Sequence, residues 1–320
     1  MRDRKLSFAR SKRTHKSARG VVPRLKAVGY GPYAAFGDAG SALLFKCQYR
    51  SHAMLNRDDF RNRFGGNAVI GMVHVAALPG APLYGGSMQA VVDAALRDAR
   101  ALRDGGCDAI AFENFGDRPF FKDRVPAETV AALTRVIVEV AAEVSVTFGV
   151  NVLRNDAGSA IAIAAATTAA FIRVNVHTGA MLTDQGIIEG RAAETLRKRA
   201  AVDPNIWIFA DHMVKHAAPM VPVDEVQAAK DLRHRGLADA IIISGAETGA
   251  EPDHVRFARV REALGDTPIL IGSGLTEANA GTFADADGAI VGTSIKIDGR
   301  VDAPVDPDRV KRLVAAFKRQ

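Results

Sequence analysis

Eight short apolar segments recur along the chain, and nearly every one ends in a polar residue or a glycine. Each is followed by a segment whose apolar residues recur with helical periodicity. Eight strand–helix units in succession predict a closed (β/α)₈ barrel, that is, a single α/β TIM barrel. The segments are VIGMVH (Val69–His74), AIAFEN (Ala109–Asn114), VTFGVN (Val146–Asn151), FIRVNVH (Phe171–His177), IWIFAD (Ile206–Asp211), AIIISG (Ala240–Gly245), ILIGSG (Ile269–Gly274) and GAIVGTS (Gly288–Ser294).

Helix signals separate these segments. Ser87 is a good N-cap for a helix that reaches about Arg103, and Gly105 and Gly106 end it. The other helices are expected near 126–144, 159–166, 191–200, 224–236, 253–265, shortly after Thr276, and 306–318. A doubly wound open sheet is the alternative fold. Eight units, with glycines after the last two strands, favour the closed barrel.

The charge of the chain divides it into two parts, residues 1–53 and 54–320. The whole chain carries a net charge of +6, yet residues 1–53 hold twelve Lys and Arg against two Asp. We therefore expect a basic, disordered N-terminal extension before the barrel. Three explanations stay open: an arm that touches nucleic acid, an organelle transit peptide, and upstream sequence ahead of a true start at Met54.

Composition and motifs narrow the class of protein. The two cysteines, Cys47 and Cys107, are not expected to pair, which favours a reducing, cytoplasmic setting. No apolar run approaches the roughly 18 residues of a membrane span. The sequence contains no G-x-x-x-x-G-K-[ST], no G-x-G-x-x-G after a strand and no C-x-x-C. We expect no nucleic-acid binding outside residues 1–53, and the sequence leaves open whether the chain forms a homo-oligomer.

Glycines and hydroxyl side chains after the last strands predict an anion site. Many TIM barrels bind a phosphate between the loops after strands seven and eight, where backbone N–H groups converge. Glycine lets the main chain approach the anion closely. The alternative is that these glycines only turn strand into loop. The expected phosphate-binding residues are Ser244, Gly245, Gly272, Ser273, Gly274, Gly292, Thr293 and Ser294.

A second cluster follows the fifth strand and contains Asp211, His212, Lys215 and His216. Lys215 could act as a base, bind an anionic group or form a Schiff base. A helical turn would place His212 and His216 on one face, so a divalent metal is compatible with the sequence, although none is required. A surface cluster of ion pairs is the plain structural alternative.

A third group consists of acid, amide and imidazole side chains at the ends of the first four strands. Glu113 follows strand two, Asn151 strand three, and Asn175 and His177 strand four. Such a set suits a polyhydroxylated ligand and one acid/base pair. Glu113 or Asp211 is the preferred base, with His177 or His74 as the acid. The expected catalytic residues are Glu113, Asn151, Asn175, His177, Asp211 and Lys215.

Several long strings resemble the BtpA/SgcQ family of barrel proteins over about Met54–Phe317. They include GMVHVAALPGAPLYGG, GVNVLRNDAGSAIAIA, FIRVNVHTGAMLTDQGIIEGRA, FADHMVKHA and IGSGLTEANA. The resemblance implies a phosphate-binding type of barrel and, through the founding member, a link to photosystem I biogenesis. The nucleoside triphosphatase label used in that family has no support here, because the chain lacks a phosphate-binding P-loop motif.

Two functions follow as expectations. The first is an enzyme that acts on a phosphorylated sugar or a nucleoside-derived small molecule, as an isomerase, epimerase, aldolase or lyase. The second is a non-catalytic assembly or accessory factor for photosystem I or another complex. Loss of Asp211 or Lys215 would disable the first and leave the second intact.

Overall fold

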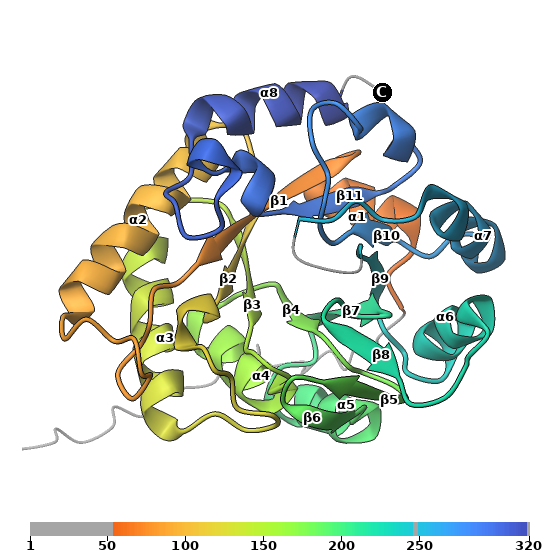
Figure 1. Cartoon of the computed structure of the whole chain (residues 1–320), viewed down its shortest axis with the longest axis horizontal. Coiled ribbons are helices and arrows are strands. Elements are labelled where there is room, and N and C mark those ends of the chain that lie inside the picture. Colours follow the sequence, from red (N-terminus) through yellow and green to blue (C-terminus); the bar gives the residue numbers. More distant parts are fainter. Residues whose placement is uncertain (1–53, 246–248, 319–320) are drawn as a thin grey trace, which may run out of the picture. The chain divides into compact units, whose positions relative to one another are not determined.

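The computed structural model describes residues 54–245 and 249–318. Eight parallel strands close into a barrel, which confirms the TIM barrel and excludes the open sheet (Figure 1). In their order around the barrel, the strands are β1 (Ala68–His74), β11 (Gly288–Val291), β10 (Ile269–Ile271), β9 (Ala240–Ile243), β7 (Trp207–His212), β4 (Phe171–Val174), β3 (Thr147–Asn151) and β2 (Ala109–Glu113). The expected extension over residues 1–53 lies outside the described residues.

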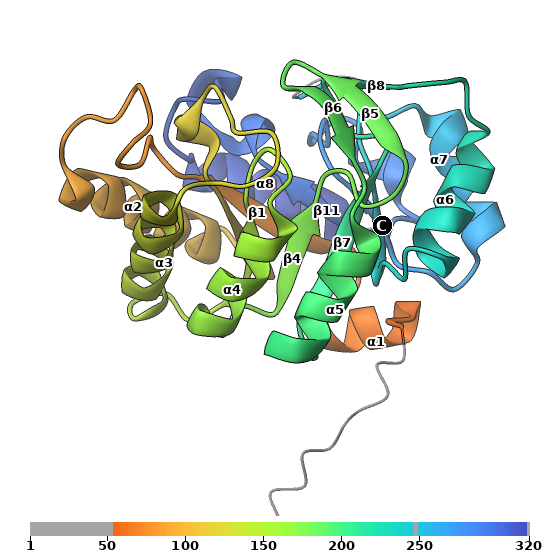
Figure 2. The ribbon, with the colours of Figure 1, turned by 90° about the horizontal axis from the view of Figure 1, so that it is seen from below.

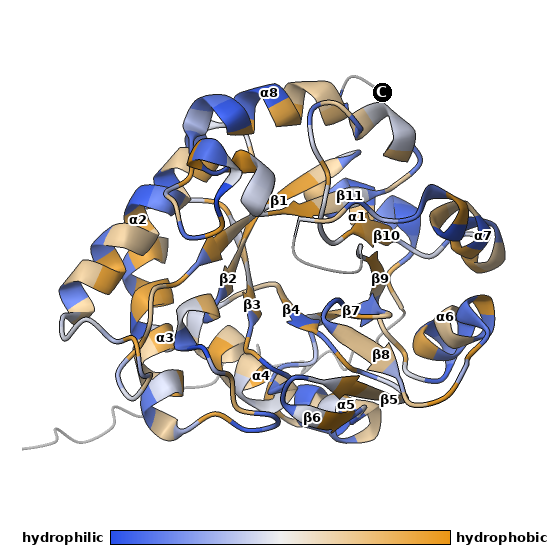
Figure 3. Ribbon diagram, in the orientation of Figure 1, coloured by the Kyte–Doolittle hydropathy of each residue, from blue (hydrophilic) through white to orange (hydrophobic). Residues whose placement is uncertain are grey.

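The helices form an outer ring around the strands (Figure 1). They are α2 (Met88–Asp104), α3 (Ala127–Ala141), α4 (Ala157–Thr167), α5 (Ala192–Val202), α6 (Glu225–His234), α7 (His254–Leu264) and α8 (Pro307–Lys318). Ser87 caps α2 as expected, by accepting a hydrogen bond from the backbone N–H of Ala90. Strands such as β1 and β9 are apolar along most of their length, whereas the helices alternate between apolar and polar residues (Figure 3). Apolar residues on both faces of the strands are therefore covered, inside the barrel and under the helices.

The seventh unit departs from the expected pattern. Between β10 and β11, where every residue is described, the chain forms only a 3₁₀ helix, Ala280–Phe283. Thr276 and Asn279 explain the tight turn before it. The Asn279 side chain accepts from the backbone N–H of Thr276 and donates to the carbonyl oxygen of Gly274. Asn279 thus anchors the glycine loop, and Thr276 Oγ1 accepts from the Asn279 backbone N–H within the turn and does not cap an α-helix.

A helix that the sequence analysis missed closes one end of the barrel. In α1 (Arg57–Phe64), Phe60 and Phe64 are buried one turn apart. The Phe64 ring lies 5.9 Å from Phe171 and 5.7 Å from Trp207, measured between ring centroids. Figure 2 shows α1 beneath the strands, at the end opposite β5, β6 and β8. Phe60 and Phe64 of α1 thus form an apolar plug at this end of the barrel. A cavity with polar lining can therefore form only at the opposite end.

A small antiparallel sheet at that other end was also missed. Strands β5 (Ala180–Thr183) and β6 (Gly186–Glu189) form a hairpin, and β8 (Ala217–Pro219) pairs with β5. The sequence analysis predicted no strands in these segments. Each strand is only three or four residues long, and short runs of this kind carry a weak periodic signal.

No helix among the described residues is long and apolar enough to cross a membrane.

Candidate functional site

The register of the first four strands aligns a row of polar residues across the barrel. His74 lies opposite Glu113, Glu113 opposite Asn151, and Asn151 opposite Arg173. Residues of one row in a barrel point to the same side, and Met72, Ala111 and Phe171 of these strands belong to the apolar interior cluster. The same alternation brings the side chains of the polar row into the barrel, at the carboxyl ends of the strands.

Glu113 is at the centre of this row. Its Oε2 accepts a hydrogen bond of 2.5 Å from Asn151 Nδ2, and its Oε1 lies 3.8 Å from His74 Nε2. Burial lowers the pKa of His74 well below its ordinary value, and the charges of Lys296 and Lys215 add to the effect. His74 is therefore a neutral imidazole near pH 7. The pair of Glu113 and His74 can exchange protons with a ligand.

Asp211, the other carboxylate expected as a base, is held by an ion pair and a hydrogen bond. The Arg173 guanidinium binds it at two points, with Nη2 2.8 Å from Oδ1 and Nε 3.1 Å from Oδ2. Asn175 Nδ2 also donates to Oδ2, at 2.7 Å. These three hydrogen bonds occupy both carboxylate oxygens of Asp211. Of the two carboxylates considered as the base, Glu113 is the one that lines the site.

Lys215 reaches the same site from the loop after β7. The chain leaves the strand with Met213 at a positive φ of 54°, and Arg154 Nη2 donates to the Lys215 carbonyl oxygen at 2.7 Å. No described residue forms a hydrogen bond or ion pair with the Lys215 ammonium group. Burial and the neighbouring Arg173 guanidinium lower the pKa of Lys215. An amine whose pKa is lowered in this way can act as a base or a nucleophile.

The helical turn expected over His212–His216 is wrong. His212 is the last residue of β7 and His216 has a positive φ of 55°, so the two residues do not share a helix face. Burial, with a contribution from Arg256, lowers the pKa of His212 to about 4. Among the described residues, no group of three or more His, Cys, Asp or Glu side chains is arranged to hold a metal ion.

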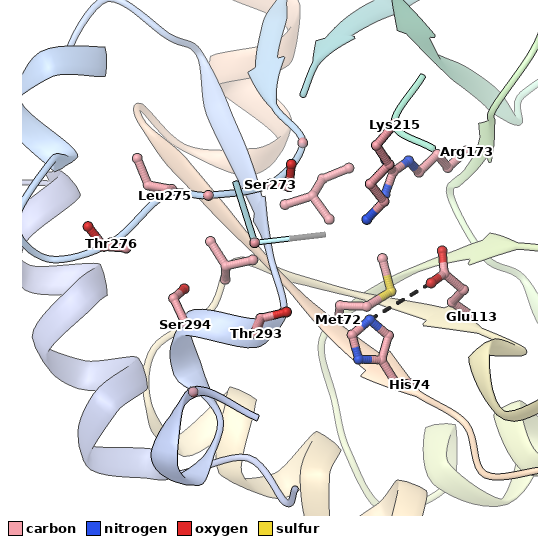
Figure 4. A pocket seen from close by; sticks show the side chains of 17 residues that line it. Met72, His74, Glu113, Arg173, Lys215, Ser273, Leu275, Thr276, Thr293 and Ser294 are labelled. Carbon is pink, nitrogen blue, oxygen red and sulfur yellow. Dashed lines mark ion pairs between the residues drawn. The ribbon is translucent and has the colours of Figure 1, made fainter. Parts of the chain in front are cut away.

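The glycine loops after β10 and β11 face Glu113 and Lys215 across a cavity of about 150 Å³, here called the glycine-loop cavity (Figure 4). Gly274 has a φ of +75°, and a Cβ there would lie 2.1 Å from the Ala250 carbonyl oxygen. Only glycine fits this turn. The cavity is lined by Gly272, Ser273, Gly274, Leu275, Thr276, Gly292, Thr293 and Ser294, together with His74, Glu113, Arg173 and Lys215.

Several donors in these loops have no acceptor among the described residues. They are the backbone N–H groups of Ser273, Gly274, Leu275, Thr293 and Ser294. The buried Ser273 hydroxyl also lacks a described partner. A cluster of free N–H and O–H donors beside a cavity is able to bind an anion.

Two of the expected phosphate-binding residues lie behind the cavity wall. The Ser244 side chain is fully buried, and a Cβ on Gly272 would meet its hydroxyl oxygen at 2.4 Å. Gly245 packs against Ala250, where a Cβ would be 2.2 Å from the carbonyl oxygen. Neither residue lines the glycine-loop cavity. Both allow the loop after β10 to pack closely.

His177 lies apart from the other candidates. Its Nε2 is 2.8 Å from the Gly236 carbonyl oxygen, at the end of α6, and the residue is buried. Burial lowers the pKa of His177. It lines neither the glycine-loop cavity nor the cavity described next. Of the two imidazoles proposed as the acid, His74 is the one beside Glu113.

A second cavity of about 500 Å³ begins where the first one ends, because Glu113 and Lys215 line both. Phe115, Phe120, Arg118 and Arg154 form much of its wall, and we call it the aromatic cavity. Asn175 also lines it. The two cavities therefore share the same carboxylate and the same amine.

Comparison with known proteins shows the family to which the chain belongs. The model of the BtpA family matches residues 66–319. The chain belongs to the BtpA family. A Synechocystis relative, named photosystem I biogenesis protein BtpA, is 45% identical over 252 residues, which cover 78% of this chain and 88% of the relative. An uncharacterised Archaeoglobus fulgidus protein is 44% identical, covering 78% and 98%. The sgc region protein SgcQ of Escherichia coli is 33% identical, covering 77% and 92%.

Solved structures share the fold of this BtpA-family protein. Tryptophan synthase from M. tuberculosis superimposes with a TM-score of 0.53 at 15% identity, covering 82% of this chain and 96% of that one. Phosphoribosyl anthranilate isomerase from Thermus thermophilus gives 0.50 at 8% identity, covering 79% and 98%. These neighbours are TIM-barrel enzymes. At such low identity the likeness concerns the fold alone.

The sequence analysis overlooked two arginines of the site. Arg173 lies within an otherwise apolar strand, and a charge in that position needs a buried partner, which was the available signal. Arg154, which follows strand three, was not placed among the site residues either. The residue is only 5% exposed and lines the aromatic cavity. Its loop gave no periodic signal for that orientation.

Proposed function

We propose that this BtpA-family barrel is an enzyme that acts on a phosphorylated sugar or a nucleoside-derived small molecule. The phosphate occupies the glycine-loop cavity and the reacting carbon lies near Glu113 and Lys215. One observation supports the proposal most strongly. The backbone N–H groups of Gly274, Leu275 and Thr293 have no described acceptor, and these residues line the cavity together with the Glu113 carboxylate and the unpaired Lys215 amine. A phosphate would satisfy those donors.

Glu113 is the proposed general base. Asn151 holds its Oε2, and Oε1 faces His74 across 3.8 Å. His74 as a neutral imidazole can donate a proton to a developing oxyanion or relay one from Glu113. These assignments suit an isomerase or epimerase, in which one proton is removed from carbon and one is returned. Asp211 holds Arg173 in place, and Asn175 in turn donates to Asp211.

Lys215 admits a second type of chemistry at the same site. Its Nζ can attack a substrate carbonyl carbon, and loss of water then forms an iminium ion, as in aldolase and lyase reactions. If this occurs, borohydride delivers hydride to the iminium carbon and fixes the sugar to Lys215 as a secondary amine. Mass spectrometry of protein treated with ribose 5-phosphate and borohydride detects the adduct. Lys215→Met is the control that must abolish it, and bound sugar without an adduct assigns Lys215 a base or electrostatic role.

Binding of ribose 5-phosphate tests the phosphate site itself. A ligand that binds the native state raises the midpoint of thermal unfolding. We expect ribose 5-phosphate and inorganic phosphate to do so. Gly274→Ala should weaken ribose 5-phosphate binding at least about tenfold, because the added methyl group collides with the Ala250 carbonyl. Undiminished affinity in Gly274→Ala contradicts the proposal.

Gly299→Ala is the matched control for this test. Gly299 lines the same cavity and also has a positive φ, of 65°, but a Cβ there meets no atom within 4 Å. The control shares the backbone strain of a left-handed residue without the collision. Affinity within about threefold of wild type is expected, since strain at one left-handed residue costs about 1 kcal/mol.

A further inference from the structure

The aromatic cavity contains a buried cation that the protein leaves largely unsatisfied. Arg154 is 5% exposed, and its only hydrogen bond from the side chain to a described residue runs from Nη2 to the Lys215 carbonyl oxygen. A guanidinium carries five N–H donors. No carboxylate of the described residues lies within ion-pair distance of it. A buried, unpaired guanidinium that lines a cavity indicates an anionic ligand.

Each carboxylate near Arg154 is either hydrogen-bonded to another buried side chain or exposed at the rim of the aromatic cavity. Asp211 is held by Arg173 at 2.8 Å, and Glu113 accepts from Asn151. Asp184, which also lines the cavity, is exposed and accepts from its neighbour Gln185. Their charges act on Arg154 only through space, against the effect of burial, which lowers its pKa. A carboxylate that enters the cavity would therefore be the first anionic partner in direct contact with Arg154.

Aromatic rings supply the rest of the wall. The Phe115 ring lies 4.6 Å from the His74 ring and 6.3 Å from Phe120, between centroids. The Arg118 guanidinium lies 4.9 Å from the Phe115 centroid. Rings at such spacings favour a flat, unsaturated group over a chain of hydroxyls. The volume of about 500 Å³ is within the range of small-molecule sites.

We propose that the aromatic cavity binds a planar ring that carries a carboxylate, with Arg154 donating to the carboxylate and Phe115 and Phe120 beside the ring. Together with the proposed function, on which this extension rests, the inference defines the substrate class. The substrate has a phosphate at one end, an aromatic or heteroaromatic acid at the other, and the reacting bond between them. Glu113 and Lys215 are placed at that bond, because they line both cavities.

Fragments test the two ends separately. Benzoate probes the aromatic cavity, benzamide is its neutral analogue, and ribose 5-phosphate probes the glycine-loop cavity. Calorimetry on the full chain is expected to show benzoate binding about tenfold tighter than benzamide, as for a hydrogen bond to a charged group. Arg154→Met is expected to abolish this preference and to leave ribose 5-phosphate affinity within about twofold. Arg154→Lys keeps the charge without the two-point geometry and should give an intermediate preference.

A second variant, Arg118→Met, tests the aromatic cavity if Arg154→Met does not fold. Arg118 is exposed and its side chain is tied only to the Phe115 ring among the described contacts, so Arg118→Met should fold normally. We expect it to weaken benzoate about threefold, as for one exposed charge, and to leave benzamide unchanged. The inference is overturned if wild type shows no preference for benzoate, or if Arg154→Met folds and keeps the preference in full. If Arg154→Met does not fold, full retention of the preference in Arg118→Met overturns it.

The two proposals fail in distinguishable ways. Binding of ribose 5-phosphate without a benzoate preference removes the inference about the aromatic cavity and leaves the proposed phosphate site. A benzoate preference lost in Arg154→Met, without ribose 5-phosphate binding, supports the aromatic cavity and contradicts the phosphate site. Gly274→Ala should affect only the ribose 5-phosphate result, since Gly274 does not line the aromatic cavity.

Discussion

Arg173 and Asp211 form a two-point ion pair inside the barrel, between neighbouring strands β4 and β7. Both side chains are almost fully shielded from water, and the shorter N–O distance is 2.8 Å. The pair neutralises the charge of Arg173 beside the site. Among the cations that line the two cavities, Lys215, Arg154 and Arg118 have no described carboxylate partner.

Asp211→Asn should destabilise the protein by about 3–5 kcal/mol, because it leaves the Arg173 charge buried without compensation. Urea denaturation at 25 °C measures the loss. Asp184→Asn is the control: Asp184 is exposed and should change stability by less than about 0.5 kcal/mol. A cost below about 1 kcal/mol for Asp211→Asn would show that the ion pair contributes little.

Lys215 should react with an acylating reagent at lower pH than an exposed lysine. Burial and Arg173 lower its pKa, so a larger fraction is neutral and nucleophilic at any pH near 8. Acetylation by acetic anhydride, followed by mass spectrometry across pH 6 to 11, gives the midpoint for each lysine. Exposed Lys122 is the comparison. Equal midpoints for Lys215 and Lys122 would count against an activated amine.

Stability should fall when the pH is lowered below about 6.5, in part because of His212. Its pKa is about 4 in the folded protein, and about 6.5 in an unfolded chain. Between these values the unfolded state binds more protons, so the contribution is complete above about pH 6.5 and declines as the pH falls. The slope for one such group is at most about 1.4 kcal/mol per pH unit.

His212→Gln should flatten this dependence. Urea denaturation at pH 7, 6 and 5 provides the slopes, and exposed His234→Gln is the matched control. His74 and His177 have lowered pKa values too and contribute with the same sign, so a residual slope is expected in the variant. Identical slopes for His212→Gln and wild type would be inconsistent with a buried neutral His212.

Phe64→Ala should cost about 3–5 kcal/mol, the usual range for removing a buried Phe. Phe64 packs on Trp207, the one tryptophan of the chain, so fluorescence reports both the change in packing and the unfolding transition. Arg63→Ala removes a guanidinium that lies 5.8 Å from the same ring and should cost less than about 1 kcal/mol. A smaller loss for Phe64→Ala than for Arg63→Ala would contradict the role of α1 as a plug.

The sequence by itself determined the barrel. Each strand is a short apolar run with a polar or glycine end, and each helix has local signals such as Ser87, so that neighbouring residues carry the information. The order of the strands also predicted that Glu113, Lys215, Gly272, Gly274 and Gly292 lie near one another, because residues after parallel strands gather at one end of a barrel. All five line the glycine-loop cavity. The α1 helix and the β5–β6–β8 sheet escaped prediction, since short elements depend on the surfaces they pack against.

Only the tertiary structure shows which of these side chains contact one another and which line the same cavity. Register between strands placed Arg173 against Asp211, whereas Glu113 lines the glycine-loop cavity. His177 contacts Gly236 and lines neither that cavity nor the aromatic cavity. Partner choice of this kind depends on distances between segments far apart in the sequence. No local pattern encodes such distances, whereas strand and helix periodicity is local and can be read directly.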